Sequence, residues 1–275
     1  MKDNENKQQQ CALITGAASG LGKMAANYLL ECGLTVFACD REYKENSREK
    51  NMHFVSMDVT NDTSVKSAFD YIKTITQKLD IVSSFAGIIS AGALLETDND
   101  EALRIFNVNV LGAHRVNKAA FELVRRAKGR YINISSEYGI LNAVPFYTLY
   151  PATKHALEMY NIGLRRELKM FGIKVVCIRP GAFSTNIIND FSSLFGKAIE
   201  KTELYKTRFD KMKALMGSEF NKAKKTTAFI KTFKKAAFSK KPKFYYKANN
   251  SFKMKLLNIL PEKLQDKLIY NILIK

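Results

Sequence analysis

The chain has 275 residues, enough for one α/β domain with a substantial core and an added tail but too few for two full-sized domains. It is 46% hydrophobic and 25% charged, as ordinary globular proteins are, and its net charge is +18. Its four cysteines are scattered without a CxxC pair, which excludes a disulfide framework and a zinc site and fits a reducing, cytoplasmic location.

Short apolar runs alternate with longer amphipathic runs along the first two thirds of the chain. The runs predicted as strands are 11–15, 34–39, 53–57, 81–86, 130–135 and 173–178. The runs predicted as helices are 20–32, 62–77, 99–127 and 151–171. Continuous β-branched runs are typical of strands covered on both faces, and their alternation with helices predicts a doubly wound parallel sheet.

The pattern changes after Gly181. Residues 186–238 are predicted to be helical, and a further short strand is predicted at 243–247. The chain then ends in two short amphipathic helices separated by Pro261. We therefore expect a single α/β domain of about seven strands, with helices on both faces and a helical C-terminal extension.

A glycine-rich turn, TGAASGLG at 15–22, follows the first strand and opens the first helix. Gly16 permits the tight turn, Gly20 lets the backbone approach a phosphate, and Gly22 allows close packing of the helix. The helix N-terminus offers free N–H groups and the positive end of its dipole. An ordinary strand–helix turn is the alternative, but this context favours a site for the pyrophosphate of a nicotinamide dinucleotide and hence an oxidoreductase.

Two aspartates at predicted strand ends extend this site. Asp40 comes 24 residues after Gly16, where a carboxylate would accept hydrogen bonds from the adenosine ribose hydroxyls and repel a 2′-phosphate. This favours NAD, although the adjacent Arg41 is placed to reach a 2′-phosphate and leaves NADP as an alternative. Asp58 is predicted to contact the adenine amino group, with a capping or loop role as the alternative.

Tyr150 and Lys154 stand one helical turn apart in YPATK, so their side chains share a helix face. A phenol has a normal pKa of about 10, and a nearby ammonium lowers it by stabilising the phenolate. Such a pair can move a proton to or from a substrate oxygen while hydride moves.

Together with the glycine turn, this pair resembles the short-chain dehydrogenase/reductase family, which has a Rossmann fold, and the resemblance runs from about residue 11 to 185. INISS at 132–136 is similar to the strand that ends in the family's catalytic serine, which implies Ser136, with Ser135 as the fallback. VNVLG at 108–112 resembles the family's asparagine motif and implies Asn109. RPGAFST at 179–185 resembles the turn beside the nicotinamide.

The resemblance implies roles for these residues. Ser136 would hydrogen-bond the substrate oxygen, Tyr150 would be the acid or base, and Asn109 would hold a water of the proton relay. Lys154 would lower the tyrosine pKa and bind the nicotinamide ribose, and no metal would be needed. The cofactor contacts expected are Gly16, Ser19, Gly20, Leu21, Gly22, Asp40, Arg41, Asp58, Val59, Ala86, Gly87, Tyr150, Lys154, Pro180, Gly181 and Thr185.

The sequence departs from the family pattern in three places. The family usually has Asn-Ala-Gly after the fourth strand, and this chain has Phe85 in place of the asparagine. The loss of that asparagine puts the rigidity of the central sheet in doubt. Thr153 replaces the usual serine before the lysine. The spacing from Ser136 to Tyr150 is fourteen residues, about one more than expected, which predicts a bulge in the loop.

The expected substrate is a bulky lipophilic alcohol or ketone, such as a hydroxysteroid or retinoid-like lipid, because both predicted pocket walls are apolar. The C-terminal segment is also similar to that of retinol and hydroxysteroid dehydrogenases. One wall is expected to contain Phe183, Ile187, Ile188, Phe191, Leu194 and Phe195, and the other Tyr138, Val144, Phe146 and Tyr147. The alternative is that these side chains only pack in the hydrophobic core.

The predicted organisation has four parts: a flexible N-terminus (1–10), a dinucleotide-binding and catalytic core (11–185), lid helices with the last strand (186–250), and a basic amphipathic tail (251–275). Residues 197–275 hold 21 Lys and Arg against 6 Asp and Glu, a net charge of +15. We expect the tail to pack on the protein or, as the second choice, to contact an anionic membrane surface. The polar N-terminus lacks a signal-peptide core, and no run of about 18 apolar residues predicts a spanning helix.

Two other functions compete with this interpretation. One is an NADPH-dependent reductase of another carbonyl class, and the other is a non-enzymatic dinucleotide-binding regulator. The catalytic set argues against the regulator, because a protein that only binds a dinucleotide needs none of it. No nucleic-acid reader motif accompanies the basic tail. The resemblance implies a homodimer or homotetramer.

Overall fold

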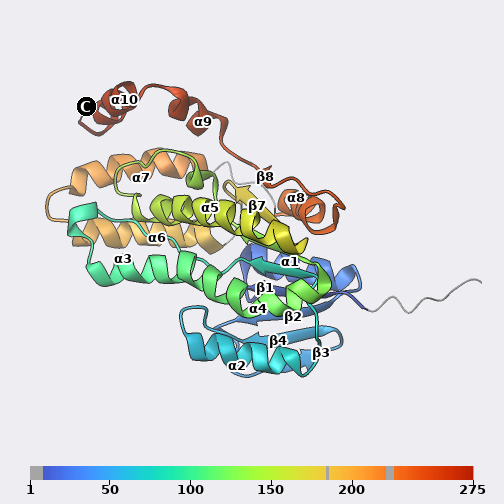
Figure 1. Ribbon diagram of the computed structural model, residues 1–275. Coiled ribbons are helices and arrows are strands. Elements are labelled where there is room, and N and C mark those ends of the chain that lie inside the picture. The colour runs from blue at the N-terminus through green and yellow to red at the C-terminus, as the bar shows by residue number, and fades with distance from the viewer. Residues whose placement is uncertain (1–8, 184–185, 221–225, 275) are drawn as a thin grey trace, which may run out of the picture.

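The computed structural model describes residues 9–183, 186–220 and 226–274 (Figure 1). Of the N-terminus predicted to be flexible, residues 1–8 lie outside the described residues, and so does Thr185 of the predicted cofactor contacts.

One sheet organises the chain. Its strands are β1 (Cys11–Thr15), β2 (Thr35–Asp40), β3 (Ser47–Glu49), β4 (Met52–Ser56), β5 (Ile81–Ser84), β6 (Arg130–Ile134), β7 (Lys174–Pro180) and β8 (Tyr245–Ala248). In the described part of the chain the order is β3-β4-β2-β1-β5-β6-β7-β8. All neighbours pair in parallel except β3 and β4. The seven predicted strands are confirmed, and the short antiparallel edge strand β3 was not predicted.

The strand order places a topological switch between β1 and β5. The chain builds β2 and β4 outward on one side of β1, then returns to β5 and builds toward β8 on the other side. Crevices that bind ligands in such sheets open at the carboxyl ends of the strands at this point. The residues that follow β1 and β5 therefore lie where a ligand site is expected.

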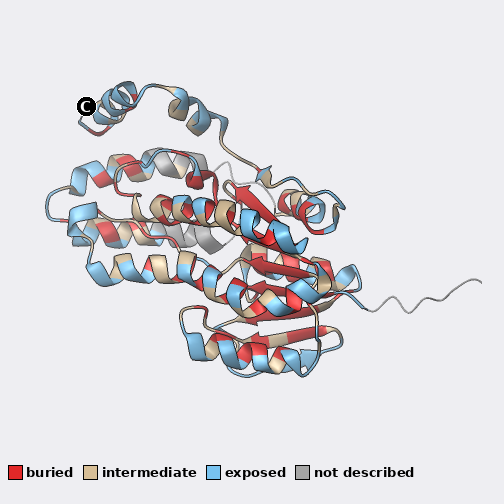
Figure 2. Cartoon of the chain, in the orientation of Figure 1, coloured by how far each residue is buried: buried red, intermediate tan, exposed pale blue. Residues whose placement is uncertain are grey.

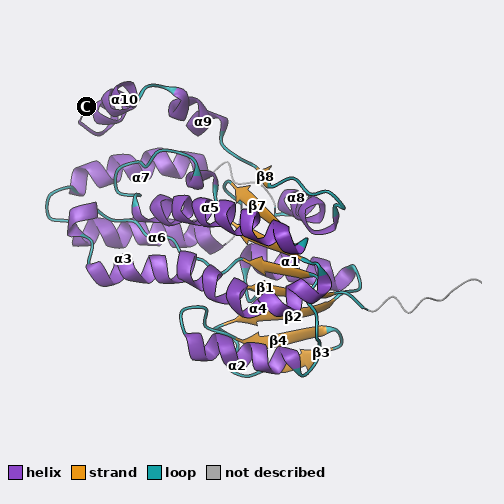
Figure 3. Cartoon of the chain, in the orientation of Figure 1, coloured by secondary structure: helices purple, strands orange, loops and turns teal. Residues whose placement is uncertain are grey.

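Helices cover both faces of the sheet, which is why the central strands are buried throughout (Figures 2 and 3). On one face, α2 (Asp62–Lys73), α4 (Ala113–Ala127) and α5 (Leu149–Leu168) enclose one apolar cluster. On the other face, α1 (Gly20–Glu31) and α8 (Thr227–Phe238) enclose a second. The central strands can be apolar on both faces because helices shield both faces of the sheet from water.

The long helix predicted at 99–127 is interrupted. It consists of α3 (Asn99–Phe106), a π-helical turn η2 (Asn107–Gly112) and α4. Such π turns insert one extra residue per turn and shift the side chains that follow. The interruption contains Asn109, one of the predicted catalytic residues. The segment is helical throughout 99–127 as predicted, and only the π-helical turn within it was not predicted.

A third cluster, the C-terminal apolar cluster, joins four C-terminal helices to the loops that follow β5 and β6. It includes α6 (Asn186–Lys201), α7 (Lys206–Phe220), α9 (Phe252–Ile259) and α10 (Glu262–Ile274), with Pro261 between the last two as predicted. Helix α10 packs against α7, and its Gln265 and Leu273 are buried. Short 3₁₀ turns complete the chain at η1 (Leu94–Glu96), η3 (Glu137–Gly139) and η4 (Lys169–Phe171).

Candidate active site

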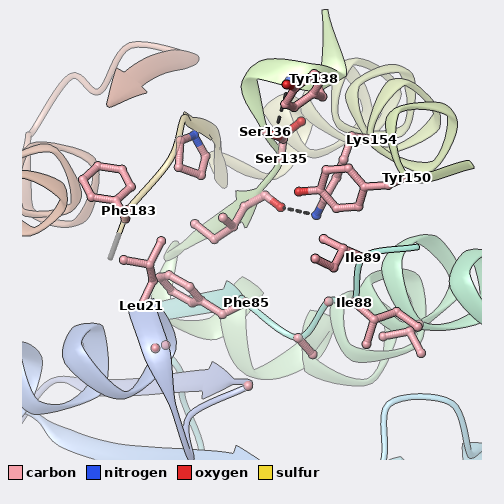
Figure 4. Close-up of a pocket in the computed structure, with 18 of the residues that line it drawn as sticks. Leu21, Phe85, Ile88, Ile89, Ser135, Ser136, Tyr138, Tyr150, Lys154 and Phe183 are labelled. Atoms are coloured by element: carbon pink, nitrogen blue, oxygen red, sulfur yellow. Dashed lines mark hydrogen bonds between the residues drawn. The ribbon is translucent and has the colours of Figure 1, made fainter. Parts of the chain in front are cut away.

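A cavity of about 1130 Å³ opens at the carboxyl ends of the parallel strands, across the switch between β1 and β5. One end is lined by the glycine turn and by Asp40 and Asp58. The other end is lined by Ser136, Tyr150 and Lys154. The structure thus brings most of the predicted cofactor residues to one cavity with Ser136, Tyr150 and Lys154 (Figure 4). Its size suits an elongated ligand together with a second, smaller one.

The glycine turn has the shape that a phosphate cradle needs. Gly16 and Gly20 have positive φ angles of 68° and 55°, which side-chain-bearing residues rarely adopt. A Cβ at Gly16 would come within 2.8 Å of the Ala86 nitrogen, and one at Gly22 would collide with the Gly16 carbonyl oxygen. The first turn of α1 contains no acidic residue. Its N–H groups and dipole therefore fit the pyrophosphate of a dinucleotide.

Asp40, at the end of β2, holds the glycine turn in place by hydrogen bonding. Its Oδ2 accepts a hydrogen bond from the Ala18 N–H at 2.9 Å, and its Oδ1 accepts one from the Glu42 N–H at 3.1 Å. The carboxylate thus fixes the turn and also lines the cavity. Arg41 is exposed and pairs with Glu42 at 3.4 Å, so its guanidinium lies at the open rim.

Asp58 has the loop role that was the alternative to adenine contact. Its Oδ1 accepts hydrogen bonds from both the N–H and the hydroxyl of Thr60, at 2.8 and 2.7 Å. Asp58 and Val59 still line the cavity at the same end as Asp40. Contact with the adenine ring stays a prediction.

Tyr150 and Lys154 lie on one face of α5, which begins at Leu149 and carries Pro151 in its first turn. The Lys154 amino group is 5.6 Å from the centre of the Tyr150 ring and donates a hydrogen bond to the Ile134 carbonyl at 3.1 Å. Figure 4 shows both side chains at the same end of the cavity as Ser136. The carbonyl at the end of β6 therefore sets the position of the ammonium.

The two candidate serines differ in their surroundings. Ser136 forms a side-chain hydrogen bond with Tyr150, and its Oγ accepts the Tyr138 N–H at 3.2 Å. Ser135 is buried, and its hydroxyl is among the buried groups without a hydrogen-bond partner in the described part of the chain. The geometry therefore favours Ser136 over the fallback Ser135.

Asn109 lies behind the cavity wall. Its Nδ2 donates to the Ile88 carbonyl and to the Thr153 hydroxyl, and its Oδ1 accepts from the Ile88 N–H at 2.8 Å. Thr153 in turn donates to the Tyr150 carbonyl at 2.7 Å. A Cβ added at Gly87 would lie 3.3 Å from Asn109 Oδ1 and 3.7 Å from Lys154 Nζ. The asparagine side chain thus ties the start of α5 to the loop after β5, and Thr153 supplies the hydroxyl that the usual serine would.

Burial dominates the protonation of the pair. It raises the pKa of Tyr150 to about 12, a change that the hydrogen bond with Ser136 opposes and the charge of Glu137 increases. Burial also lowers the pKa of Lys154 to about 8, although Cys177 and Glu158 favour its charged form. The shift of the tyrosine pKa is thus opposite to the one expected from a neighbouring ammonium, because desolvation by burial is its largest cause.

The residues predicted to border the nicotinamide or to form the pocket walls divide between the cavity and the apolar core. Pro180 and Gly181 line the cavity, as do Tyr138 and Tyr147. Phe146 is buried and stacks on Phe209 at 3.9 Å in the C-terminal apolar cluster, which also contains Val144 and Phe195, so these three have the core role. The side chains of Ile187, Ile188 and Phe191 lie outside the described residues.

The cavity is also lined by residues that were not predicted from the sequence. Glu137 directly follows Ser136, and the segment 249–254 forms a wall at the start of the C-terminal tail. Its position directly after the predicted catalytic serine was a usable signal for Glu137. No local pattern indicates that a tail segment returns to the cavity. Among the described residues, no cluster of three His, Cys, Asp or Glu side chains could hold a metal.

Replacing Lys154 with Met should stabilise the fold at neutral pH. The native pKa of Lys154 is lowered from 10.5 to about 8, so its protonated form costs stability below pH 8. We expect the free energy of unfolding at pH 7 to rise by about 1–3 kcal/mol, reduced by the lost donor to Ile134. The gain should fade between about pH 8 and 10.5, where native Lys154 is neutral but the unfolded side chain is still protonated.

Urea unfolding at pH 7 and pH 10 measures the free energy of unfolding of the variant and of the unaltered protein. The exposed Lys253→Met is the control. A midpoint that is unchanged or lower at pH 7 would contradict the prediction.

Comparison with known proteins places the site in a family. The family model for short chain dehydrogenases matches residues 10–193. The 3-ketodihydrosphingosine reductase of Bacteroides thetaiotaomicron is 36% identical over 66% of this chain and 67% of its own length. The 3-amino-tetrahydro-pyrrolizinone reductase of Xenorhabdus hominickii is 33% identical over 72% of this chain and 71% of its own. Estradiol 17-beta-dehydrogenase 2 of Rattus norvegicus is 33% identical over 67% of this chain, and the match spans 51% of its length.

Among solved structures, ElxO with NADP bound is 26% identical, with a TM-score of 0.69 over 88% of this chain and 97% of that chain. The family model alone covers well over half of the 275 residues. The chain therefore belongs to the short-chain dehydrogenase family.

Proposed function

We propose that the protein transfers hydride between a nicotinamide dinucleotide and a carbonyl–alcohol pair on a bulky lipophilic molecule. The pair is a ketone and a secondary alcohol, or an aldehyde and a primary alcohol. The observation that carries the proposal is the single cavity that joins the glycine turn to the hydroxyl of Tyr150. The names of the relatives, which are reductases and dehydrogenases, support the same class of reaction.

The chain's own residues hold the substrate oxygen and move its proton. The bound cofactor supplies or accepts the hydride. Ser136 and Tyr150 hydrogen-bond the oxygen, since both side chains line the same cavity and the hydroxyl of Ser136 lowers the pKa of Tyr150 against the effect of burial. In the reducing direction Tyr150 donates its proton, and its pKa of about 12 keeps it protonated at neutral pH. In the oxidising direction the ammonium of Lys154 stabilises the phenolate.

The far wall of the cavity supports a lipophilic substrate. Aromatic and aliphatic side chains line much of the cavity outside the glycine turn: Ile89, Tyr138, Tyr147, Phe183, Phe252 and Met254. Two relatives are named for reductions of large or ring-bearing ketones, and one of these names includes an amino group on the ring. A third is named for a steroid. We therefore propose a ketone or alcohol that is attached to a lipid chain or to fused rings.

Replacing Tyr150 with Phe should abolish turnover and leave cofactor binding nearly intact. The change removes the hydroxyl that donates the proton and keeps the ring that packs in the wall. We expect kcat to fall by a factor of about a thousand or more, while the dissociation constant for NADH or NADPH changes less than about threefold. The exposed Tyr270→Phe is the matched control. Comparable turnover in the Tyr150 variant would rule out this mechanism.

For the cofactor we propose NAD, with NADP as the second candidate. Asp40 places a negative charge at the ribose end of the cavity, which disfavours a 2′-phosphate. Two observations support the second candidate: Arg41 is exposed beside Asp40, and the related ElxO structure contains NADP.

Replacing Asp40 with Asn tests this choice. An amide oxygen can still accept the Ala18 N–H, so the turn should persist while the charge is lost. We expect the ratio of kcat/KM for NADPH to that for NADH to rise about tenfold or more. Arg41→Ala should lower the same ratio. If the unaltered protein already prefers NADPH, the assignment of Asp40 is wrong.

We also propose that the tail contacts an anionic membrane surface. In α9, Phe252, Leu256 and Ile259 are exposed at helical spacing, and the exposed Lys253 and Lys255 lie between them. The exposed apolar residues of α10 are Leu264, Leu268, Tyr270, Ile272 and Ile274. Such helices lie at lipid interfaces, where lysines pair with anionic headgroups. No helix in the described residues is long and apolar enough to span a bilayer.

The double variant Leu256→Ser, Ile259→Ser should weaken this contact. Co-sedimentation with phosphatidylglycerol vesicles should fall several-fold, since two of the three exposed apolar side chains of α9 are lost. Leu103→Ser, on the exposed side of α3, is the control and should bind as the unaltered protein does. Equal binding to neutral phosphatidylcholine vesicles, or no binding to either kind, would contradict the proposal.

A further inference from the structure

An ion pair is buried where α5 packs on β7 (Figure 1). Its members, Glu158 of α5 and Arg179 of β7, are 6% and 9% exposed. In every other ion pair among the described residues, at least one side chain is half exposed or more. The Arg179 Nε donates to Glu158 Oε1 at 2.9 Å and Nη2 donates to Oε2 at 2.8 Å. Two parallel hydrogen bonds between planar groups fix both distance and orientation.

Both members of the pair also contact neighbouring segments. The Cys177 thiol donates to Glu158 Oε1 at 3.3 Å. A Cβ added at Gly139, in the loop after β6, would lie 3.0 Å from Glu158 Cγ and 3.2 Å from its Oε1. The guanidinium of Arg179 lies 3.6 Å from the centre of the Tyr245 ring of β8. The pair thus joins α5, β7, β8 and the loop after β6.

Two of these segments contain the candidate catalytic residues. Lys154 and Tyr150 precede Glu158 by one and two turns of α5. Ser136 begins the short turn η3, which ends at Gly139 against the Glu158 side chain. Any movement of Glu158 relative to this loop therefore changes how the serine lies relative to the tyrosine and the lysine.

The third segment leads to another part of the cavity wall. Arg179 is followed directly by Pro180 and Gly181, which both line the cavity. A guanidinium that is anchored to α5 by two hydrogen bonds fixes the backbone of these neighbours relative to the same helix. The ion pair is therefore a common anchor for three sides of the candidate active site.

Stability alone does not account for such a pair. Taking two charges out of water costs energy that their attraction only just repays, and replacing a buried pair by apolar side chains is often neutral or stabilising. Apolar side chains would fill the same space, but they lack the fixed geometry of the fork between guanidinium and carboxylate. What the pair supplies beyond packing is thus a defined arrangement of the segments it joins.

We propose that Glu158 and Arg179 are positioning residues for the proposed hydride transfer. The pair keeps Ser136, Tyr150 and the end of β7 in the one arrangement that the reaction requires. Its loss should therefore slow the chemical step more than it weakens binding of the cofactor. This inference rests on the proposed function and adds residues outside the cavity to the same site.

Replacing both members with Met separates positioning from stability. Glu158→Met or Arg179→Met alone leaves a buried charge unpaired, which should lower the unfolding midpoint. The double variant removes both charges, so its midpoint should exceed those of the two single variants. The exposed pair of α4, changed in the same way by Glu122→Met with Arg125→Met, is the matched control.

Steady-state rates are measured with NADH and NADPH on methyl nonyl ketone, and again with cofactor deuterated at the transferred hydrogen. In the double Met variant at positions 158 and 179, kcat should fall about tenfold or more. The kinetic isotope effect on kcat should rise, because the chemical step then limits turnover. The dissociation constant for the cofactor should change less than about threefold, since the glycine turn is not among the joined segments. The control pair should change none of these.

Arg179→Lys decides the question if the double variant does not fold. It keeps the positive charge beside Glu158 and loses the fork, so kcat should fall about threefold or more while the cofactor still binds. A folded double variant whose kcat stays within about threefold of the unaltered protein would overturn the inference. If only Arg179→Lys folds, an unchanged kcat would do so.

The outcomes distinguish this inference from the proposed function. If the unaltered protein and the double variant reduce the ketone alike, the positioning role is overturned and the proposed function stands. If the unaltered protein reduces no ketone, the proposed function is in question, and amide hydrogen exchange decides the inference. Exchange in 135–141 and 181–183 should then be several-fold faster in the variant, with α2 unchanged. Equal exchange in these segments would overturn the inference.

Discussion

The contact between the turn after β1 and the loop after β5 is the constraint on which the rest of the site depends. The Thr15 hydroxyl accepts hydrogen bonds from the N–H groups of both Phe85 and Ala86, at 3.1 and 3.2 Å. Gly16 lies so close to Ala86 that no side chain fits between them. This contact fixes the N-terminus of α1 beside the loop that carries Gly87, and through Gly87 beside Lys154. The two central strands therefore fix the distance between the glycine turn and the candidate catalytic residues.

Packing of the loop after β5 on α8 explains how the chain tolerates phenylalanine at position 85, where its family usually has asparagine. The Phe85 ring lies 5.8 Å from each of the Phe229 and Phe233 rings of α8, and both of these side chains are fully buried. An aromatic cluster under the loop thus supplies the rigidity that was in doubt from the sequence. Such a cluster contributes through buried area and edge-to-face packing, on the order of 1 kcal/mol per pair beyond burial.

The fold was predictable because its signals are local, and the missed features depend on contacts between distant segments. β1 reads CALIT and is buried at every position, so its apolar run alone indicates a covered strand. β3 consists of Ser47–Glu49, is exposed throughout, and forms because β4 offers it an edge. The π turn at Asn109 has no sequence signature. Phe146 was equally suited to the wall and to the core, and its stacking on Phe209 placed it in the core.

The C-terminal tail and the catalytic loop form one unit, which changes what the tail means for function. Beyond the hydrogen bond from the Ser251 N–H to Glu137, Asn142 donates its N–H to Asn258 and its side-chain amide to Gln265. These contacts join the loop that follows Ser136 to both helices of the tail. The position of the tail helices and that of the loop after Ser136 are therefore linked by hydrogen bonds at three points. The part of the chain beyond the region matched by the family model thus contributes to the wall of the cavity whose candidate catalytic residues lie within that region.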